Sequence, residues 1–168
     1  MEVESFASLT EFAIAIAGFS GIVIALESRN GAISLLTWLR NTVLLAWALG
    51  AAFGSTFPAL VSNFGATGPS VWVYSGVLLA GICFALLLVP LLAARRLDRP
   101  SRSQLSPLMW VLALGGNPAA GTLLLLNSGS VFGTPSPGPV YGVVLWLLAF
   151  ATLLFARLLT APPVPSSA

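Results

Sequence analysis

The stretch VWVYSGVLLAGICFALLLVPLLAA, residues 71–94, contains no charged residue and ends directly before the pair Arg95-Arg96. An apolar run of about twenty residues is long enough to cross the hydrocarbon core of a bilayer as an α-helix. The other apolar runs lie at residues 7–26, 33–60, 105–126 and 140–159. The pattern predicts an all-α, polytopic integral membrane bundle of five transmembrane helices. Residues 1–160 form one domain in this prediction, and the proline-rich segment 161–168 is a flexible C-terminal tail.

The amino-acid composition agrees with a membrane location. Hydrophobic residues make up 57% of the chain and charged residues only 7%, against roughly 25% charged residues in an ordinary soluble domain. The net charge of +2 rests on arginine alone, and no basic patch with interleaved aromatic residues lies outside the apolar runs. Nucleic-acid binding is therefore not indicated, and the lipid bilayer is the first expected partner. Arginine without any lysine suggests a GC-rich bacterial genome.

The arginines indicate how the helices are oriented. Arg29 lies between the first two runs, Arg157 closes the fifth, and the segment RRLDRPSR at 95–102 separates the third from the fourth. With five crossings all three positions fall on one side, which the positive-inside rule assigns to the cytoplasm. We therefore expect a bacterial cytoplasmic (inner) membrane protein with its N-terminus outside and its C-terminus in the cytoplasm. An arrangement with four crossings and a re-entrant segment ranks second, because it places Arg157 outside.

The basic loop contains Arg95, Arg96, Arg99 and Arg102. A topology signal is the simpler interpretation of these four residues. The alternative is a contact with anionic lipid headgroups, to which each basic residue near the membrane surface contributes on the order of 1 kcal/mol.

Glu11 is an acidic residue one to two helical turns inside the first apolar run. On a helical wheel it shares a face with Ala15 and Gly18, and small residues line helix–helix contacts in membranes. Glu11 is therefore expected at the edge of a packing face, looking into the bundle, where an acid is by default a candidate functional residue. The alternative is that Glu11 lies at the outer interface and is simply solvated.

The second run begins with TWLRNT, residues 37–42, which places Arg40 and Asn41 on a small and polar helix face with Ser55. Arg40 and Asn41 are therefore two further candidate polar residues of the pore or interior. Because this run is longer than a bilayer requires, Arg40 can also extend to the cytoplasmic headgroups without a special role. A pair between Arg40 and Glu27, near the end of the first run, is the other possibility left open.

The segment GGNPAAG at 115–121 interrupts the fourth run. Gly115 and Gly116 weaken a helix and Pro118 removes a backbone donor, so the helix is expected to be kinked or broken there. In the broken form, Asn117 is the N-cap of a half-helix whose free N–H groups lie at mid-membrane. Asn117 is accordingly the fourth candidate pore or interior polar residue.

The tripeptide Asn117-Pro118-Ala119 is similar to the NPA motif of aquaporins, which begins a half-helix at the pore centre. The resemblance ends at these three residues, since the chain has no second NPA, no inverted repeat and no arginine after the motif to form a selectivity filter. The chain is also too short for the six crossings and two half-helices of that family. We do not assign it to the aquaporins.

Residue types required for catalysis and for metal binding are scarce. The chain has no histidine, which rules out histidine-ligated haem, histidine-based zinc sites and Ser–His or Cys–His pairs. Asp98 is the only aspartate, and Cys83 is the only cysteine and lies inside an apolar run. We therefore expect no enzymatic activity, no metal site and no cofactor.

Two functions compete on these grounds. The four candidate polar residues favour a homo-oligomeric channel or a permeation protein for small solutes or ions. Several copies would be needed, because one chain is too small to enclose a wide pore. The alternative is a non-catalytic structural or accessory subunit of a larger membrane complex. The expected protein partner is a second copy of the chain or another membrane subunit. A membrane-perturbing effector recruited through the arginine loop is a third and weaker possibility.

Overall fold

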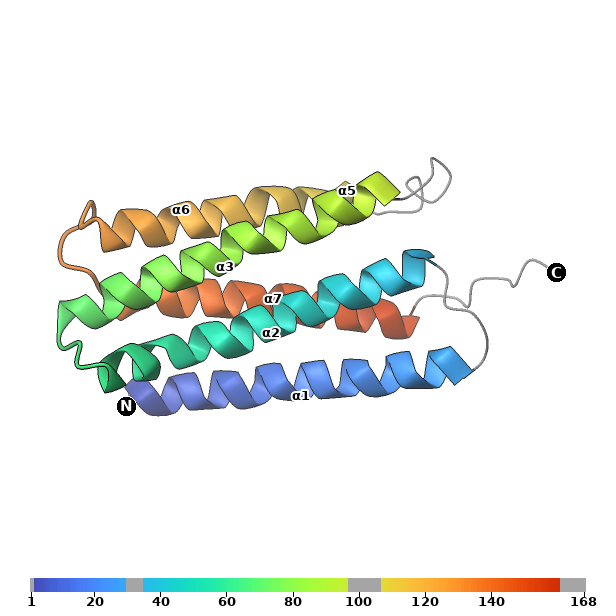
Figure 1. The fold of residues 1–168 in the computed structure, drawn as a ribbon, viewed down its shortest axis with the longest axis horizontal. Coiled ribbons are helices and arrows are strands. Elements are labelled where there is room, and N and C mark those ends of the chain that lie inside the picture. The colour runs from blue at the N-terminus through green and yellow to red at the C-terminus, as the bar shows by residue number, and fades with distance from the viewer. Residues whose placement is uncertain (1, 30–34, 97–106, 161–168) are drawn as a thin grey trace.

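The computed structural model describes residues 2–29, 35–96 and 107–160, and this part of the chain is almost entirely helical (Figure 1). The helices are α1 (Glu2–Arg29), α2 (Leu35–Asn63), α3 (Pro69–Arg96), α5 (Pro107–Val111), the π-helical turn η1 (Leu112–Gly116), α6 (Asn117–Ser128) and α7 (Pro137–Thr160). The predicted all-helical fold is confirmed for the described residues, which contain no β-strand. The tail predicted at 161–168 lies outside them.

Four helices, α1, α2, α3 and α7, are long and apolar enough to cross a membrane. Their apolar segments are Phe6–Val23, Trp38–Asn63, Pro69–Leu92 and Pro137–Thr160. The run predicted at 105–126 is divided among α5, η1 and α6, none of which is long enough by itself. The prediction of five membrane-spanning helices is therefore supported for four of them.

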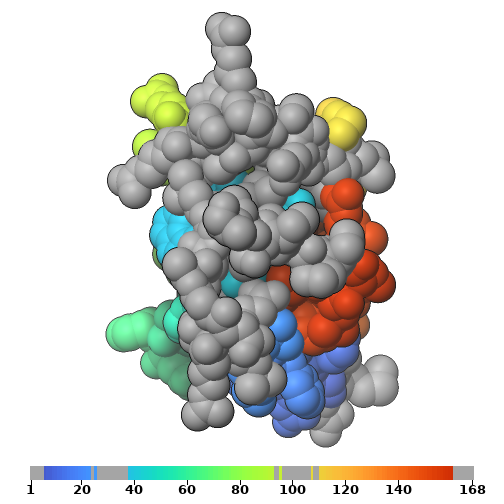
Figure 2. Space-filling view, turned by 90° about the vertical axis from the view of Figure 1, so that its right-hand side faces the viewer, coloured from blue at the N-terminus to red at the C-terminus, as the bar shows by residue number. Residues whose placement is uncertain are grey.

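The rods that follow each other along the chain run antiparallel, and they pack in two layers with one flanking helix. In Figure 1, α2 and α3 lie in front, α7 and α6 lie behind them, and α1 runs along the lower edge against α2 and α7. Figure 2 looks along the bundle from its right-hand end and shows the same order, with α1 below, α2 on the left and α7 on the right. The beginning of α1 and the end of α7 lie at opposite ends of the bundle (Figure 1).

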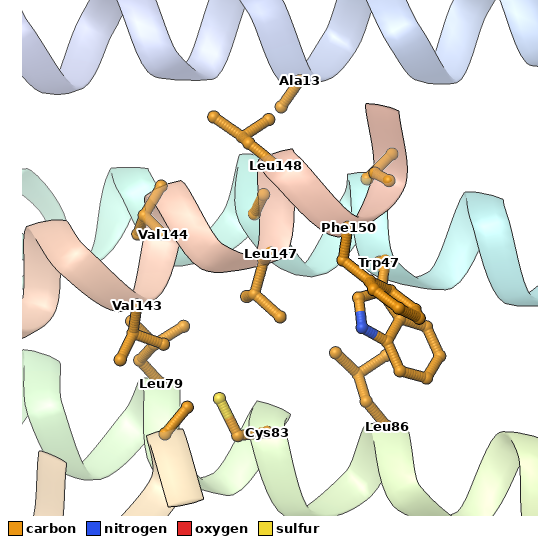
Figure 3. Packing of buried hydrophobic residues seen from close by; sticks show 14 of the residues in the cluster. Ala13, Trp47, Leu79, Cys83, Leu86, Val143, Val144, Leu147, Leu148 and Phe150 are labelled. Carbon is orange, nitrogen blue, oxygen red and sulfur yellow. The ribbon is translucent and has the colours of Figure 1, made fainter. Parts of the chain in front are cut away.

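Close side-chain packing fills the centre of the bundle (Figure 3). Trp47 of α2 is fully buried, and its ring centroid lies 5.5 Å from that of Phe150 of α7. The α2 backbone comes so near to α3 at Gly54 that an added Cβ would lie 2.6 Å from Leu79 Cδ1. Because lipid tails are as apolar as these side chains, van der Waals packing and interhelical hydrogen bonds must hold the helices together.

Hydroxyl groups link neighbouring helices at fixed positions. Thr10 Oγ1 of α1 and Ser55 Oγ of α2 lie 2.6 Å apart, and the Ser128 hydroxyl of α6 donates to the Val73 carbonyl of α3 over 3.2 Å. Polar groups in hydrocarbon have no water as an alternative partner. These bonds therefore help to set the register between the helices that they join.

The two described connections lie at the end of the bundle where α1 begins (Figure 1). Between α2 and α3, Gly65 and Gly68 adopt left-handed backbone angles, with φ of 91° and 58°, which glycine adopts at little cost. Pro69 then begins α3, a position that suits its fixed φ. Between α6 and α7, the Asn127 amide bonds both to the carbonyl and to the N–H of Ser136, over 3.2 and 3.4 Å.

Candidate functional site

The four predicted polar residues are not brought together within one chain. Glu11 is exposed on α1, Arg40 is half-buried near the start of α2, and Asn41 and Asn117 are buried. Along α2, the interior beyond Asn41 is filled by apolar side chains, including Trp47. The predicted set therefore does not form a continuous polar path through the described part of a single chain.

Glu11 lies on the side of α1 that faces away from the bundle, which differs from its predicted place on an inward face. The packed side of α1 contains Phe6 and Ala13, together with Thr10 in its contact with α2. At Gly18, on the exposed side, no atom lies within 4 Å of an added Cβ. The inward placement of Glu11 is therefore not found: α1 packs through the face that contains Ala13 and Ala17, whereas Glu11 lies on the opposite face with Ala15 and Gly18.

An aromatic level near the beginning of α1 indicates the depth of Glu11. The Phe6 ring stacks on Trp72 at 6.3 Å and meets Tyr141 edge-on at 5.5 Å. Tryptophan and tyrosine gather at the membrane–water interface, and Glu11 lies about 7 Å further along α1 at 1.5 Å per residue. Glu11 therefore lies inside the apolar segment Phe6–Val23 of α1, which is long and apolar enough to cross a membrane.

The GGNPAAG segment forms a widened helical turn rather than an interruption. The π-helical turn η1 ends at Gly116 (φ −68°, ψ −42°), and α6 follows at once from Asn117 (φ −66°, ψ −46°). No side chain caps the start of α6, so the half-helix with Asn117 as its N-cap is not formed. Pro118 lacks the N–H that would bond to the Leu114 carbonyl, and the π-helical turn just before it accommodates that loss.

Asn117 faces the interior and pairs with Trp146 of α7. The Trp146 Nε1–H donates to Asn117 Oδ1 over 3.4 Å, while Asn117 Nδ2 has no partner among the described residues. Gly116 permits this approach, because a Cβ there would overlap the Trp146 ring, whereas Gly115 faces open space. Trp146 was not among the predicted site residues, since only its indole donor marks it as a partner for a buried amide.

The oxygen and the nitrogen of the Asn41 side-chain amide both lack hydrogen-bond partners among the described residues. The residue is 4% exposed, and neither Asn41 Oδ1 nor Nδ2 has a hydrogen-bond partner in the described part of the chain. Trp47 Nε1 and Ser75 Oγ are buried in the same condition. Burial of such a group without a hydrogen bond costs about 1–3 kcal/mol by protein mutational data. These groups therefore lower the stability of an isolated chain.

Arg40 is half-buried near the end of the bundle at which α2 begins and α7 ends. Its guanidinium group lies close enough to that of Arg157 for the two charges to repel each other. Arg95 is exposed near the end of α3, at the same end of the bundle. The Arg96 and Glu27 side chains, and all of Arg99 and Arg102, lie outside the described residues.

The remaining surface of the described chain offers little that suggests a ligand. A shallow, open depression beside the α2–α3 turn is lined by Val61, Phe64 and Tyr74, among others. Among the described residues, no group of three or more histidine, cysteine, aspartate or glutamate side chains is placed to hold a metal ion. Neither feature indicates a specific ligand.

Comparison with protein-family models, with curated proteins and with solved structures finds no significant match to this chain. The similarity of residues 117–119 to the aquaporin tripeptide is not extended by these comparisons. A proposal for the function therefore depends on the placement of the polar residues and on the packing of the helices.

Proposed function

We propose that this chain is a five-span protein of the bacterial cytoplasmic membrane that self-associates, with permeation of small solutes or ions between its copies. The observation that carries this proposal is the exposed Glu11, on the hydrocarbon side of the aromatic level, beside an interior filled by apolar side chains. We assign the chain no catalytic step, metal or cofactor of its own.

The composite rod α5–η1–α6 supplies the fifth crossing. Its helical backbone runs without a gap from Pro107 to Ser128, which is roughly 30 Å at about 1.5 Å per residue and similar to the usual hydrocarbon thickness. The rod lies beside α3, with Ser128 bonded to Val73 and Gly121 in close approach to Phe84. An odd number of crossings agrees with the opposite placement of the start of α1 and the end of α7 (Figure 1).

The arginine-bearing end of the bundle is the cytoplasmic end in this proposal. Arg40, Arg95 and Arg157 lie near the ends of α2, α3 and α7 that meet there. Excess arginine near the ends of membrane helices marks the cytoplasmic side. The N-terminus is then outside and the C-terminus is in the cytoplasm.

Self-association through α1 is supported by the cost of leaving Glu11 in lipid. The apolar segment of α1 is 22% buried, against 50% for that of α2. Gly18, near the middle of the exposed face, leaves room for the backbone of another helix, and small residues allow such approach in membranes. When copies meet along this face, their Glu11 side chains line the space between them, where acidic side chains favour cations.

A structural or accessory subunit is the second candidate, and the packing of the interior favours it. Fully buried side chains, including those of Trp47, Leu79 and Leu147, fill the centre of the described bundle. In this candidate the exposed face of α1 binds a different membrane protein. Glu11 then pairs with a basic or polar group of that partner.

Reconstitution of the purified chain in liposomes tests the first candidate. We expect flux of small cations under an imposed gradient, and a reduction of roughly tenfold or more in Glu11→Gln, because the acid concentrates cations locally. Phe12→Leu is the matched control, since Phe12 is also exposed but points about 100° away from Glu11 on the helix. Asn117→Leu should also leave the flux unchanged, because Asn117 is buried inside one chain.

The outcomes separate the two candidates. Absence of flux under every gradient tested, from chains that are folded, would exclude permeation and leave the accessory role. Flux that is equal in wild type and Glu11→Gln would contradict the role given to Glu11. Native mass in detergent reports self-association independently, and a strictly monomeric chain would contradict the first candidate.

A further inference from the structure

A contact between two buried aromatic side chains defines the register between α2 and α7. The ring centroids of Trp47 and Phe150 lie 5.5 Å apart, and both side chains are buried. Two helical turns from this pair, toward the end where α2 begins and α7 finishes, α2 carries Arg40 and α7 carries Arg157. Residues two turns apart lie on nearly the same face of an α-helix. The two arginines therefore oppose each other across the α2–α7 contact.

This pair of like charges has no described counter-charge. Arg40 is half-buried and Arg157 is exposed, and their guanidinium groups repel each other. Among the side chains that the structure describes, the only acid is Glu11, which lies in the other half of the bundle. A negatively charged group placed between the two arginines would convert this repulsion into two attractions.

The pair also lies at the depth of lipid headgroups. The Thr10–Ser55 contact relates α1 to α2, and Phe6 belongs to the aromatic level at the far end. Along the helices, Arg40 lies about 28 Å from that level at 1.5 Å per residue, and the hydrocarbon core is about 30 Å thick. With the aromatic level at one interface, Arg40 and Arg157 lie at the other, where lipid phosphates are found.

We propose that Arg40 and Arg157 together bind the phosphate group of an anionic phospholipid between α2 and α7. The guanidinium group is planar and permanently charged, and its paired N–H donors match two phosphate oxygens. Because Arg40 is partly shielded from solvent, salt screens its charge less than that of the exposed Arg95. The inference rests on the proposed membrane placement and does not depend on permeation.

A lipid suits this position better than a free anion because apolar surface continues below the charges. Leu153 lies one turn deeper than Arg157 on the same side of α7 and is 43% exposed. An acyl chain attached to the bound phosphate can lie along this side chain. Inorganic phosphate has no acyl chain that could contact Leu153.

Native mass spectrometry of the full chain, released from nanodiscs that mix phosphatidylcholine and phosphatidylglycerol, tests the site. The wild type is expected to retain phosphatidylglycerol in preference to phosphatidylcholine. Arg40→Gln and Arg157→Gln should each lower this preference roughly fivefold, the change expected for one basic contact. Arg95→Gln is the matched control, because it removes the same charge at the same end from an exposed position, and it should leave the preference nearly unchanged.

Several results would overturn the site. No preference for phosphatidylglycerol in the wild type would do so, and so would an equal loss in Arg95→Gln, which would show an effect of net charge alone. Displacement of the lipid by inorganic phosphate would identify a free-anion site instead. A preference seen only in Glu27→Gln would show that Glu27 already neutralises the arginines. If Arg40→Gln fails to fold, Arg157→Gln decides, because Arg157 is exposed. Lipid retention is measured without any flux, so this test can be interpreted even if the chain proves not to permit permeation.

Discussion

The hydroxyl oxygens of Thr10 and Ser55 lie 2.6 Å apart and form a polar link between α1 and α2. Each hydroxyl also lies near a backbone carbonyl of its own helix, 2.9 Å from that of Phe6 and 2.8 Å from that of Ala52. Each hydroxyl has one proton to donate, so the two protons serve three contacts. The link between the helices therefore competes with the bonds inside them.

Removal of this link should loosen α1. Thr10→Val keeps the shape of the side chain but removes its hydroxyl, and we expect a loss of about 0.6 kcal/mol, with ~1.7 kcal/mol as the upper end. Unfolding in detergent measures the change, and Ser55→Ala with the double variant completes a thermodynamic cycle. A coupling energy of zero would show that the two hydroxyls act only on their own helices.

Two neighbouring glycines should respond differently to alanine. In Gly116→Ala the new Cβ overlaps the Trp146 ring, and we expect a loss of about 1–3 kcal/mol, as for an overpacked core, with a shift in tryptophan emission. Gly115→Ala adds its Cβ in open space and should be neutral or slightly stabilising, because alanine is the better helix former. Equal losses of stability in both variants would contradict the described packing of η1 against α7.

Asn41 should be replaceable by an apolar residue with a gain in stability. Both of its amide groups are buried without partners among the described residues, so Asn41→Leu removes a desolvation cost of about 1–3 kcal/mol. Asn127→Leu is the contrasting variant, because Asn127 is equally buried but bonds twice to Ser136, and it should destabilise the fold. Thermal unfolding compares the two, and a loss of stability in Asn41→Leu would show that the Asn41 amide has a partner after all.

The exposed face of α1 should cross-link to a second copy. Gly18→Cys places a thiol in open space near the middle of this face, and mild oxidation should then produce a disulfide-linked dimer on a non-reducing gel. The native Cys83 is buried and should not contribute to the product. Phe12→Cys, at the edge of the exposed face, is the control. A dimer yield as high as that of Gly18→Cys would mean that the contact is not specific to this face.

The extent of the helices could be predicted from the sequence, whereas their rotation could not. The run at 71–94 gave nearly the bounds of α3, Pro69–Arg96, because turn residues precede it and charged residues follow it. The direction in which Glu11 points depends on which face of α1 packs against the neighbouring helices. That choice is made by contacts such as Phe6 with Tyr141, between residues far apart in the chain.

In the candidate sites, too, local features could be predicted from the sequence, whereas contacts between helices could not. Pro118 and its two glycines predicted a kinked or broken helix, and the structure has a π-helical turn that continues directly into α6. The position of this irregularity could be predicted because backbone donors and flexibility are local properties. The link from Asn117 to Trp146 and the opposition of Arg40 and Arg157 join different helices. Their recognition requires the register between those helices, which appears only once the core is packed.

The π-helical turn at Leu112–Gly116 determines how the fourth apolar rod, α5–η1–α6, responds to a change in chain length. Such a turn holds one residue more than an α-helical turn, and each residue of an α-helix advances the chain by about 100°. Deletion of one residue there would remove the extra residue and restore a regular helix, in which α5, with Trp110, keeps nearly its present facing relative to α6. The same deletion in a regular part of the rod would rotate the two flanking parts against each other by that angle. Loss of a single codon should therefore be tolerated better at this turn than in the regular parts of the rod.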